Sequence, residues 1–179
     1  MIWFVITFFV LSVIAGCFIF PKLSPVPYFP SYKDIPGVLI DFFKKNKKEF
    51  AEYDVFVDLG AGDGGLIFSL AMKNRSFNWR YLAVEINPFL VFFMRVRKFF
   101  GRFSNLQVVW ADFFAFKYEF SQKMIFYLYL SPEYLNKLIE FLRKKADGVV
   151  ISYFYRPDSL QIIKAIKLKN GRYLYVCRL

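Results

Sequence analysis

The sequence predicts an α/β fold with a doubly wound, mostly parallel sheet of seven strands. Short apolar runs alternate with stretches of helical periodicity, and a glycine-rich loop joins the first strand-like run to a helix. This alternation is typical of a parallel sheet covered by helices on both faces. An Asn-Gly pair separates the last two strand-like runs. Since that pair is a strong hairpin signal, we expect the sheet to end in an antiparallel hairpin.

Each predicted element is bounded by glycine, proline or polar residues. Strands are predicted at Val55–Leu59, Tyr81–Glu85, Gln107–Trp110, Met124–Leu130, Gly148–Tyr155, Leu160–Leu168 and Arg172–Arg178. Helices are predicted at Ile35–Phe50, Gly65–Lys73, Pro88–Phe100 and Pro132–Lys145. Three of these helices follow a residue of capping type, with proline in the first turn. The capping residues are Asp34, Asn87 and Ser131.

The first apolar segment predicts a transmembrane helix. No charged residue occurs from Ile2 to Phe20, and about 20 apolar residues cross the hydrocarbon core of a bilayer as a helix. Every Lys and Arg follows the segment, so the positive-inside rule predicts a single-pass membrane protein whose main domain is cytoplasmic. One alternative is a cleaved signal peptide, for which the segment lacks a basic N-terminal region. The other is a lipoprotein signal, because Ile14–Cys17 resembles a lipoprotein cleavage box.

The sequence therefore divides into three parts. Residues 1–21 are the predicted transmembrane anchor, residues 22–34 a proline-rich and extended connector, and residues 35–179 the α/β domain.

Composition restricts the chemistry more than it restricts the partners. The chain has 25 Lys+Arg against 14 Asp+Glu and a net charge of +11. A basic surface suits anionic lipid, an acidic protein or nucleic acid, but the bias of an AT-rich genome explains the charge equally well. The chain contains no histidine, which excludes Ser-His and Cys-His catalysis and His-ligated metals. Cys17 and Cys177 show no metal-binding spacing, so no metal site is predicted.

A glycine-rich loop leaves the first predicted strand and enters a helix. Glycines in such a loop permit a tight turn and bring the backbone close to a ligand at the helix N-terminus. The residues expected to contact a nucleotide through their backbone are Gly60, Ala61, Gly62 and Gly64.

Asp58 favours S-adenosylmethionine (SAM) over a dinucleotide as the ligand of this loop. Gly60, Gly62 and Gly65 also fit the G-x-G-x-x-G pattern of dinucleotide sites. An acid two residues before the first glycine would repel a negatively charged pyrophosphate, but it attracts the ammonium and sulfonium groups of SAM. The short stretch of chain after the loop also leaves little room for the catalytic domain of a dehydrogenase. We therefore expect SAM as the cofactor, with a purely structural glycine turn as the alternative.

Two more acids follow the second and third predicted strands. Glu85 can accept both ribose hydroxyls of a nucleoside, with Ile86 beside it. Asp112 can bind the adenine amino group, and Phe113 can stack on the adenine ring. The carboxyl ends of parallel strands meet at one edge of a sheet, so one nucleoside can contact all of these residues. A solvated acid at a strand end is the alternative for Glu85.

These motifs resemble those of class I SAM-dependent methyltransferases, which implies a Rossmann-like methyltransferase sheet. A narrower resemblance is to the membrane-anchored protein lysine methyltransferases, which include mitochondrial enzymes acting on the ATP synthase c-subunit and the adenine nucleotide translocase. The chain is similar to that family in its apolar N-terminal helix and in the segments Pro27–Ser31, Asp58–Gly64 and Glu85–Val91. It departs from the family pattern at Gly65 and at Phe92–Met94.

The resemblance implies SAM-dependent methylation of lysine on a membrane-associated protein. The implied partners are that protein and a lipid bilayer, contacted through the N-terminal helix and the basic surface. An aromatic channel would disfavour the lysine ammonium and hold the methylated product by cation–π contact. Tyr28 and Tyr153 are the catalytic candidates, and core filling is the competing interpretation for aromatic residues such as Phe154.

Three other functions remain open. The acceptor of the methyl group can be a lipid, a quinone or another small molecule, or the chain can be a non-catalytic, membrane-tethered SAM-binding module. Nucleic acid is a less favoured acceptor. The residues Leu130–Tyr134 do not match the Asn/Asp-Pro-Pro-aromatic signature of enzymes that methylate amino groups of DNA and RNA.

Overall fold

A computed structural model of the protein describes residues 1, 3–4, 7–8, 31–74, 76–115 and 123–179. The candidate residue Tyr28, the lipoprotein-like segment and most of the predicted connector lie outside the described residues.

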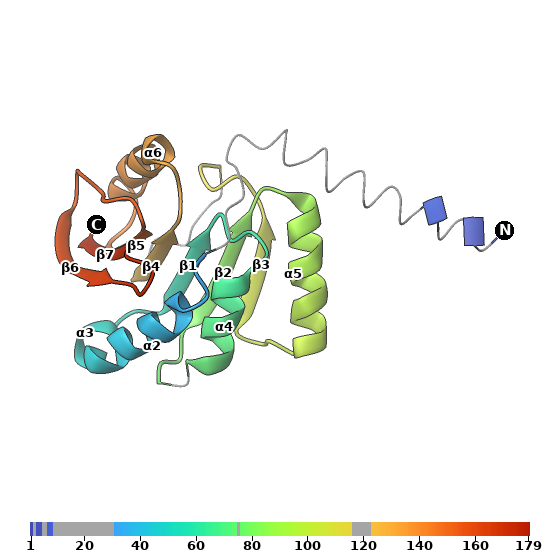
Figure 1. Ribbon diagram of the computed structural model, residues 1–179, viewed down its shortest axis with the longest axis horizontal. Coiled ribbons are helices and arrows are strands. Elements are labelled where there is room, and N and C mark those ends of the chain that lie inside the picture. The colour runs from blue at the N-terminus through green and yellow to red at the C-terminus, as the bar shows by residue number, and fades with distance from the viewer. Residues whose placement is uncertain (2, 5–6, 9–30, 75, 116–122) are drawn as a thin grey trace.

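Seven strands in the described residues form one mixed sheet, in the order β3-β2-β1-β4-β5-β7-β6 (Figure 1). The first five strands pair in parallel, whereas β7 pairs antiparallel with both β5 and β6. The strands are β1 Val55–Leu59, β2 Arg80–Glu85, β3 Leu106–Trp110, β4 Met124–Leu128, β5 Gly148–Tyr153, β6 Gln161–Lys167 and β7 Tyr173–Arg178. The predicted mostly parallel sheet with a C-terminal hairpin is confirmed.

Helices cover both faces of the sheet, as the alternation of elements predicts. Buried side chains of α2, α4 and α5 join one apolar cluster, and those of α6 join a second cluster on the other face. Figure 1 shows α5 at the outer edge, beside β3. The helices are α2 Ile35–Lys45, α3 Lys47–Phe50, α4 Gly65–Lys73, α5 Pro88–Gly101 and α6 Pro132–Arg143.

The helix predicted at Ile35–Phe50 is interrupted at Asn46. Asn46 leaves the helical conformation at φ −112° and ψ 34°, and its side-chain nitrogen donates to the carbonyl of Phe42 at 2.8 Å. Side chains that can hydrogen-bond nearby backbone compete with the helix in this way. The break lets α3 return toward α2, so the rings of Phe50 and Phe43 pack at 4.9 Å between centroids.

One of the three predicted side-chain caps is confirmed. The Asn87 side chain accepts hydrogen bonds from the backbone of Phe89 at 3.0 Å and Leu90 at 3.4 Å. Asp34 and Ser131 make no side-chain cap hydrogen bond, so these two predictions are wrong. Asp34 has helical dihedrals of φ −84° and ψ −12°, which differ from the extended backbone of a typical capping residue.

The predicted transmembrane helix and single-pass membrane location are wrong. In the parts of the chain that the structure describes, no helix has both the length and the apolar character needed to cross a membrane. The longest helix among these residues, α5, has 14 residues, which at 1.5 Å per residue is about 21 Å against about 30 Å of hydrocarbon. Most of the predicted anchor, residues 9–20, lies outside the described residues.

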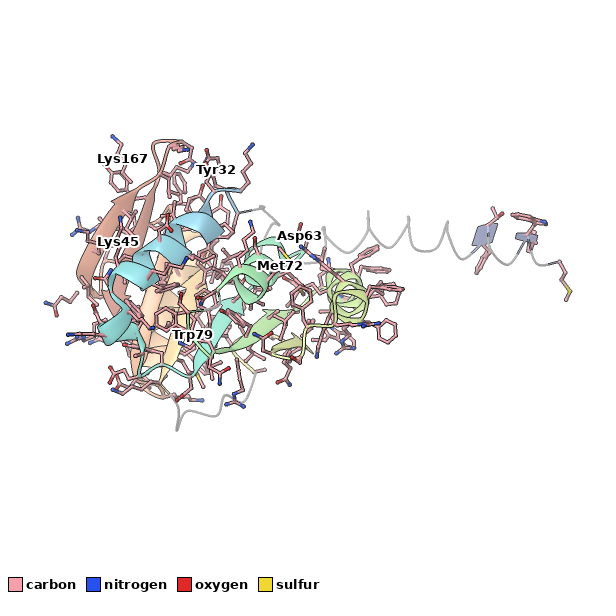
Figure 2. The ribbon with its side chains drawn as sticks, turned by 90° about the horizontal axis from the view of Figure 1, so that it is seen from below. Tyr32, Lys45, Asp63, Met72, Trp79 and Lys167 are labelled. Carbon is pink, nitrogen blue, oxygen red and sulfur yellow. The ribbon has the colours of Figure 1, made fainter. Side chains whose placement is uncertain are left out.

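A cluster of aromatic side chains packs under α2. The Phe43 side chain is fully buried. Its ring centroid lies 4.9 Å from those of Phe50 and Trp79 and 6.3 Å from that of Phe56. Trp79, labelled in Figure 2, immediately precedes β2. These contacts fix α2 and α3 on the sheet.

We expect Phe43→Ala to lower the free energy of unfolding by about 3–5 kcal/mol, because the removed ring leaves a cavity between tightly packed neighbours. Chemical denaturation measures this loss. Phe99→Ala on α5 is the matched control, since that side chain is 77% exposed. Its effect should stay within about 0.5 kcal/mol. Equal losses for the two variants would contradict the assignment of Phe43 to the core.

Candidate functional site

The three acids predicted to bind a nucleoside lie at the carboxyl edge of adjacent strands. Asp58 is the penultimate residue of β1 and pairs with Ala83 of β2. Glu85 is the last residue of β2 and pairs with Trp110, the last residue of β3. Asp112 follows two residues later in the chain. The sheet therefore brings the three acids to one edge, as the sequence predicts.

The glycine-rich loop turns sharply between β1 and α4. Gly60, Gly62 and Gly64 have positive φ angles of 80°, 59° and 74°, a region that glycine enters without steric cost. The backbone nitrogens of Gly60 and Ala61 donate to the carbonyl of Val84 at 2.9 and 3.1 Å. The loop is thereby fixed to the end of β2.

Gly64 also allows close packing behind the loop. A Cβ atom at this position would lie 2.7 Å from the Phe68 ring and 2.9 Å from the Met94 sulfur. Such contacts are shorter than packed cores tolerate, so a side chain at Gly64 would force the Phe68 and Met94 side chains to shift. The glycine therefore serves both the conformation of the turn and the contact between the two helices.

Glu85 joins the glycine-rich loop to the turn before α5. Its Oε2 accepts a hydrogen bond from the Gly62 nitrogen at 2.8 Å, and its Oε1 accepts one from the Asn87 nitrogen at 2.9 Å. Each carboxylate oxygen has a second lone pair that can accept a further hydrogen bond. The carboxylate is thus held in place and can still bind two hydroxyl groups.

Asp58 has the most perturbed carboxyl group of the site. Its side chain is only 3% exposed. Burial, followed by the negative charges of Glu85 and Asp63, raises the pKa of Asp58 from 3.8 to about 8. All three causes disfavour the ionised carboxylate. A cation beside Asp58 would stabilise the carboxylate and offset them. The site therefore favours a positively charged ligand.

Asp112 and Phe113 lie in the turn after β3. Asp112 is exposed, and its Oδ1 accepts a hydrogen bond from the Phe114 nitrogen at 2.9 Å. Phe113 is half-buried and packs against the apolar cluster on the α6 face. Its ring centroid is 4.8 Å from that of Phe114. This arrangement leaves the adenine-binding roles of Asp112 and Phe113 as predictions.

Ile86 lies beside the same turn. Its carbonyl accepts a hydrogen bond from the Trp110 indole at 2.9 Å, and the Ala111 nitrogen donates to the carbonyl of Glu85 at 3.0 Å. The turns after β2 and β3 are thus bonded together. The Ile86 side chain is 40% exposed, which leaves an apolar surface next to the Glu85 carboxylate.

Tyrosines extend the edge from β1 toward β5. Tyr127 of β4 pairs with Asp58 across the β1–β4 ladder, and its hydroxyl lies 3.0 Å from the Ser31 hydroxyl. Burial raises the pKa of Tyr127 well above its usual value, so this phenol stays neutral. Tyr153 ends β5, and its ring packs on that of Tyr129 at 4.6 Å between centroids.

Of these tyrosines, Tyr153 is predicted from the sequence, whereas Tyr127 and Tyr129 are not. Their position in the sequence could have indicated them, since both lie near the end of the strand predicted at Met124–Leu130. They were passed over because pairing between β1 and β4 joins parts of the chain far apart in sequence. The site thus has an acidic part on β1–β3 and an aromatic part on β4–β5.

The chain is similar to known proteins in its three-dimensional structure, but no sequence comparison finds a match. No protein-family model and no curated protein sequence matches the chain. An RNA methyltransferase from Salinibacter ruber, solved with S-adenosyl-L-homocysteine, superposes with a TM-score of 0.69 at 24% identity over 84% of this chain and 93% of that one. The putative methyltransferase yhhF from Escherichia coli gives 0.62 at 14% identity over 86% and 89%. The chain has the methyltransferase fold.

A further solved structure supports the methyltransferase fold. A SAM-dependent methyltransferase from Aquifex aeolicus superposes with a TM-score of 0.55 at 12% identity, over 83% of this chain and 99% of that one. At these identities the comparisons establish the fold. They give no support to the narrower resemblance to membrane-anchored lysine methyltransferases.

The raised pKa of Asp58 predicts a pH dependence of stability for this methyltransferase fold. The folded chain keeps a proton that the unfolded chain releases, so this group lowers stability as pH rises from about 4 to about 8. Asparagine does not ionise. The stability of Asp58→Asn relative to the natural chain should therefore increase by more than about 1 kcal/mol as the pH rises from 5 to 8.

Urea unfolding at the two pH values, without added ligand, measures this gain. Asp41→Asn changes an exposed aspartate of α2 and is the control, for which we expect no such gain. A stability difference between Asp58→Asn and the natural chain that stays constant with pH would contradict a raised pKa at Asp58.

Proposed function

We propose that this protein is a SAM-dependent methyltransferase that methylates a lysine side chain of a protein. The observation that carries the proposal is the buried Asp58 carboxyl group beside Glu85 and Asp63, which favours a cationic ligand. SAM offers an ammonium and a sulfonium, whereas the pyrophosphate of a dinucleotide would add negative charge. The complex of the Salinibacter ruber enzyme with S-adenosyl-L-homocysteine supports the same choice.

Each predicted cofactor residue has a role in this proposal. Asp58 attracts the ammonium group, and Glu85 accepts the ribose hydroxyls through its remaining lone pairs. Asp112 binds the adenine amino group, while Ile86 and Phe113 pack against the adenine ring. The backbone of the loop residues approaches the ligand closely. These loop residues are Gly60, Ala61, Gly62 and Gly64.

Methyl transfer from SAM suits the side chains of this chain. SAM supplies the activated methyl group, and its transfer to an amine is an in-line displacement that depends mainly on alignment. The protein needs no nucleophile of its own, which fits a sequence without histidine. A lysine acceptor must first lose a proton, at a cost of about 4 kcal/mol near neutral pH. An apolar, aromatic surface lowers that cost because it disfavours the ammonium.

The aromatic part of the site supports an amine as the acceptor. Tyr153 lies at the end of β5 beside Tyr129, and Tyr127 is the register partner of Asp58. We keep Tyr153 and Tyr28 as the candidates that contact the acceptor. The segment after β4, Leu130–Tyr134, lacks the signature of nucleic-acid amino methylation. Protein lysine is therefore the acceptor we propose, with RNA, lipid and small molecules as the outcomes that would replace it.

We expect Glu85→Gln to weaken SAM binding at least tenfold, because two charge-assisted hydrogen bonds become neutral ones. Calorimetric titration of the purified protein with SAM measures the affinity. Glu52→Gln is the matched control. Glu52 precedes β1, at the opposite edge of the sheet from the site. It is exposed and pairs with Lys123 at 2.6 Å, so its loss should leave SAM affinity unchanged. Equal affinity for the Glu85→Gln variant and the natural chain would remove Glu85 from the cofactor site.

The acceptor class can be read from a transfer assay. Methyl-labelled SAM and the purified protein are incubated with a cell extract from a strain lacking this gene, and the label is followed into protein, RNA and organic-solvent fractions. We expect label in protein, and mass spectrometry should find it as a methyl group on lysine. Label in RNA or in the organic fraction would refute the lysine acceptor. Tight SAM binding with label in none of the fractions would indicate a non-catalytic binding module.

A further inference from the structure

The Arg172 side chain contacts two aromatic rings and two tyrosine hydroxyls at the carboxyl edge of the sheet. The Arg172 guanidinium carbon is 4.3 Å from the centroid of Phe154 and 6.0 Å from that of Tyr153. Its Nη1 donates to the hydroxyls of Tyr129 and Tyr153, both at 3.4 Å. We call the rings of Tyr129, Tyr153 and Phe154 the aromatic cage.

The aromatic cage borders the acidic part of the site. Tyr129 follows β4, on which Tyr127 is the register partner of Asp58. Tyr153 ends β5, and the Phe154 nitrogen donates to the carbonyl of Tyr173 at 2.9 Å, which joins the cage to the start of β7. The turn of the β6–β7 hairpin, which contains Arg172, therefore lies at the carboxyl end of β5. Figure 2 labels Tyr32 and Lys167 at this end of the molecule.

The backbone at Phe154 is strained. Phe154 has a φ of 76°, and the Tyr155 nitrogen donates to the carbonyl of Tyr153 at 3.0 Å across it. This is a γ-turn of the rare, strained form. A non-glycine residue in such a conformation costs about 1–3 kcal/mol and is found mainly at functional sites. The turn holds the Phe154 ring against the guanidinium instead of letting β5 continue.

We propose that the aromatic cage binds the methylated ammonium group of the product, and that Arg172 occupies the cage until this group displaces it. The choice of an amine acceptor rests on the proposed function. Aromatic faces attract cations, and cages of two or three rings are well suited to methylated ammonium groups. An anionic group would instead meet the negative faces of the rings.

Displacement of Arg172 requires little energy. Its side chain is exposed, and the two hydrogen bonds of 3.4 Å are longer than the usual range for N–H donors. A guanidinium that leaves the cage can be solvated at once. The cage residues are fixed more firmly, because Tyr153 is buried and its hydroxyl also accepts a hydrogen bond from the Asn170 side chain at 3.1 Å.

The test measures binding of tetramethylammonium, a probe that has no hydrogen-bond donors and therefore reports cation–π contact alone. The full chain is titrated with tetramethylammonium chloride, and binding is followed by NMR shifts of the Tyr129 and Phe154 rings. Arg172→Ala should raise the affinity about tenfold, because the probe no longer competes with the resident cation. Lys167→Ala removes the same charge from β6, outside the cage, and should change the affinity less than twofold.

Phe154→Ala in the Arg172→Ala background should abolish the gain, with the thermal midpoint recorded to confirm that the variant is folded. The proposal is overturned if Arg172→Ala leaves the affinity unchanged or lowers it, or if Lys167→Ala raises it equally. SAM titration of the same samples separates the two claims. If the natural chain does not bind SAM, the proposed cofactor is refuted. If it binds SAM but Arg172→Ala does not raise the affinity for tetramethylammonium, the cage alone is refuted.

Discussion

A buried carboxyl group among other acids is the constraint on which the rest of the site depends. Asp58 occupies the carboxyl end of β1, almost fully buried, with Glu85 and Asp63 as its charged neighbours. Such an arrangement lowers the stability of the folded chain at neutral pH. Groups with strongly perturbed pKa values that lower the stability of the fold are found mainly at functional sites. The glycine-rich loop and the two hydrogen bonds of Glu85 keep these acids in place.

The sheet connects this acidic part of the site to the aromatic one. The β1–β4 ladder places Tyr127 directly beside Asp58, and the β4–β5 ladder continues to Tyr153. An acidic surface and an aromatic surface thus share one edge of the sheet. In the proposed reaction the acidic surface holds a cationic cofactor, while the aromatic surface receives an amine that must lose its charge before it reacts. Methyl transfer to an amine requires both properties, because the methyl donor is a cation and the acceptor nitrogen must be neutral.

Local patterns allowed much of the fold and of the acidic part to be predicted. β1 and α4 have the predicted bounds because an apolar run, a glycine turn and a helical stretch follow one another directly. The Asn-Gly hairpin is present, with Gly171 at a φ of 80°. The break at Asn46 was missed because a side-chain hydrogen bond competes there with a good helical pattern. The transmembrane prediction rested on hydropathy alone.

The aromatic part could not be predicted to the same extent. Tyr129, Tyr153 and Arg172 come from three distant segments, and only strand pairing and the final hairpin bring them together. The positive φ of Phe154 has no sequence signal, since the residue is neither glycine nor asparagine. Aromatic residues are also common throughout the chain, at 22%, so their type alone did not distinguish a site from the core.

The central claim, that the buried Asp58 carboxyl group favours a cationic ligand, can be measured directly. Carbon-13 NMR of aspartate-labelled protein, with Asp58→Asn used to assign the signal, follows this carboxyl group through a pH titration before and after saturation with SAM. The account predicts a pKa of about 8 without SAM and a large fall in the pKa when SAM is bound. An Asp58 that is already ionised at pH 6 without SAM, or whose pKa does not respond to SAM, would contradict it.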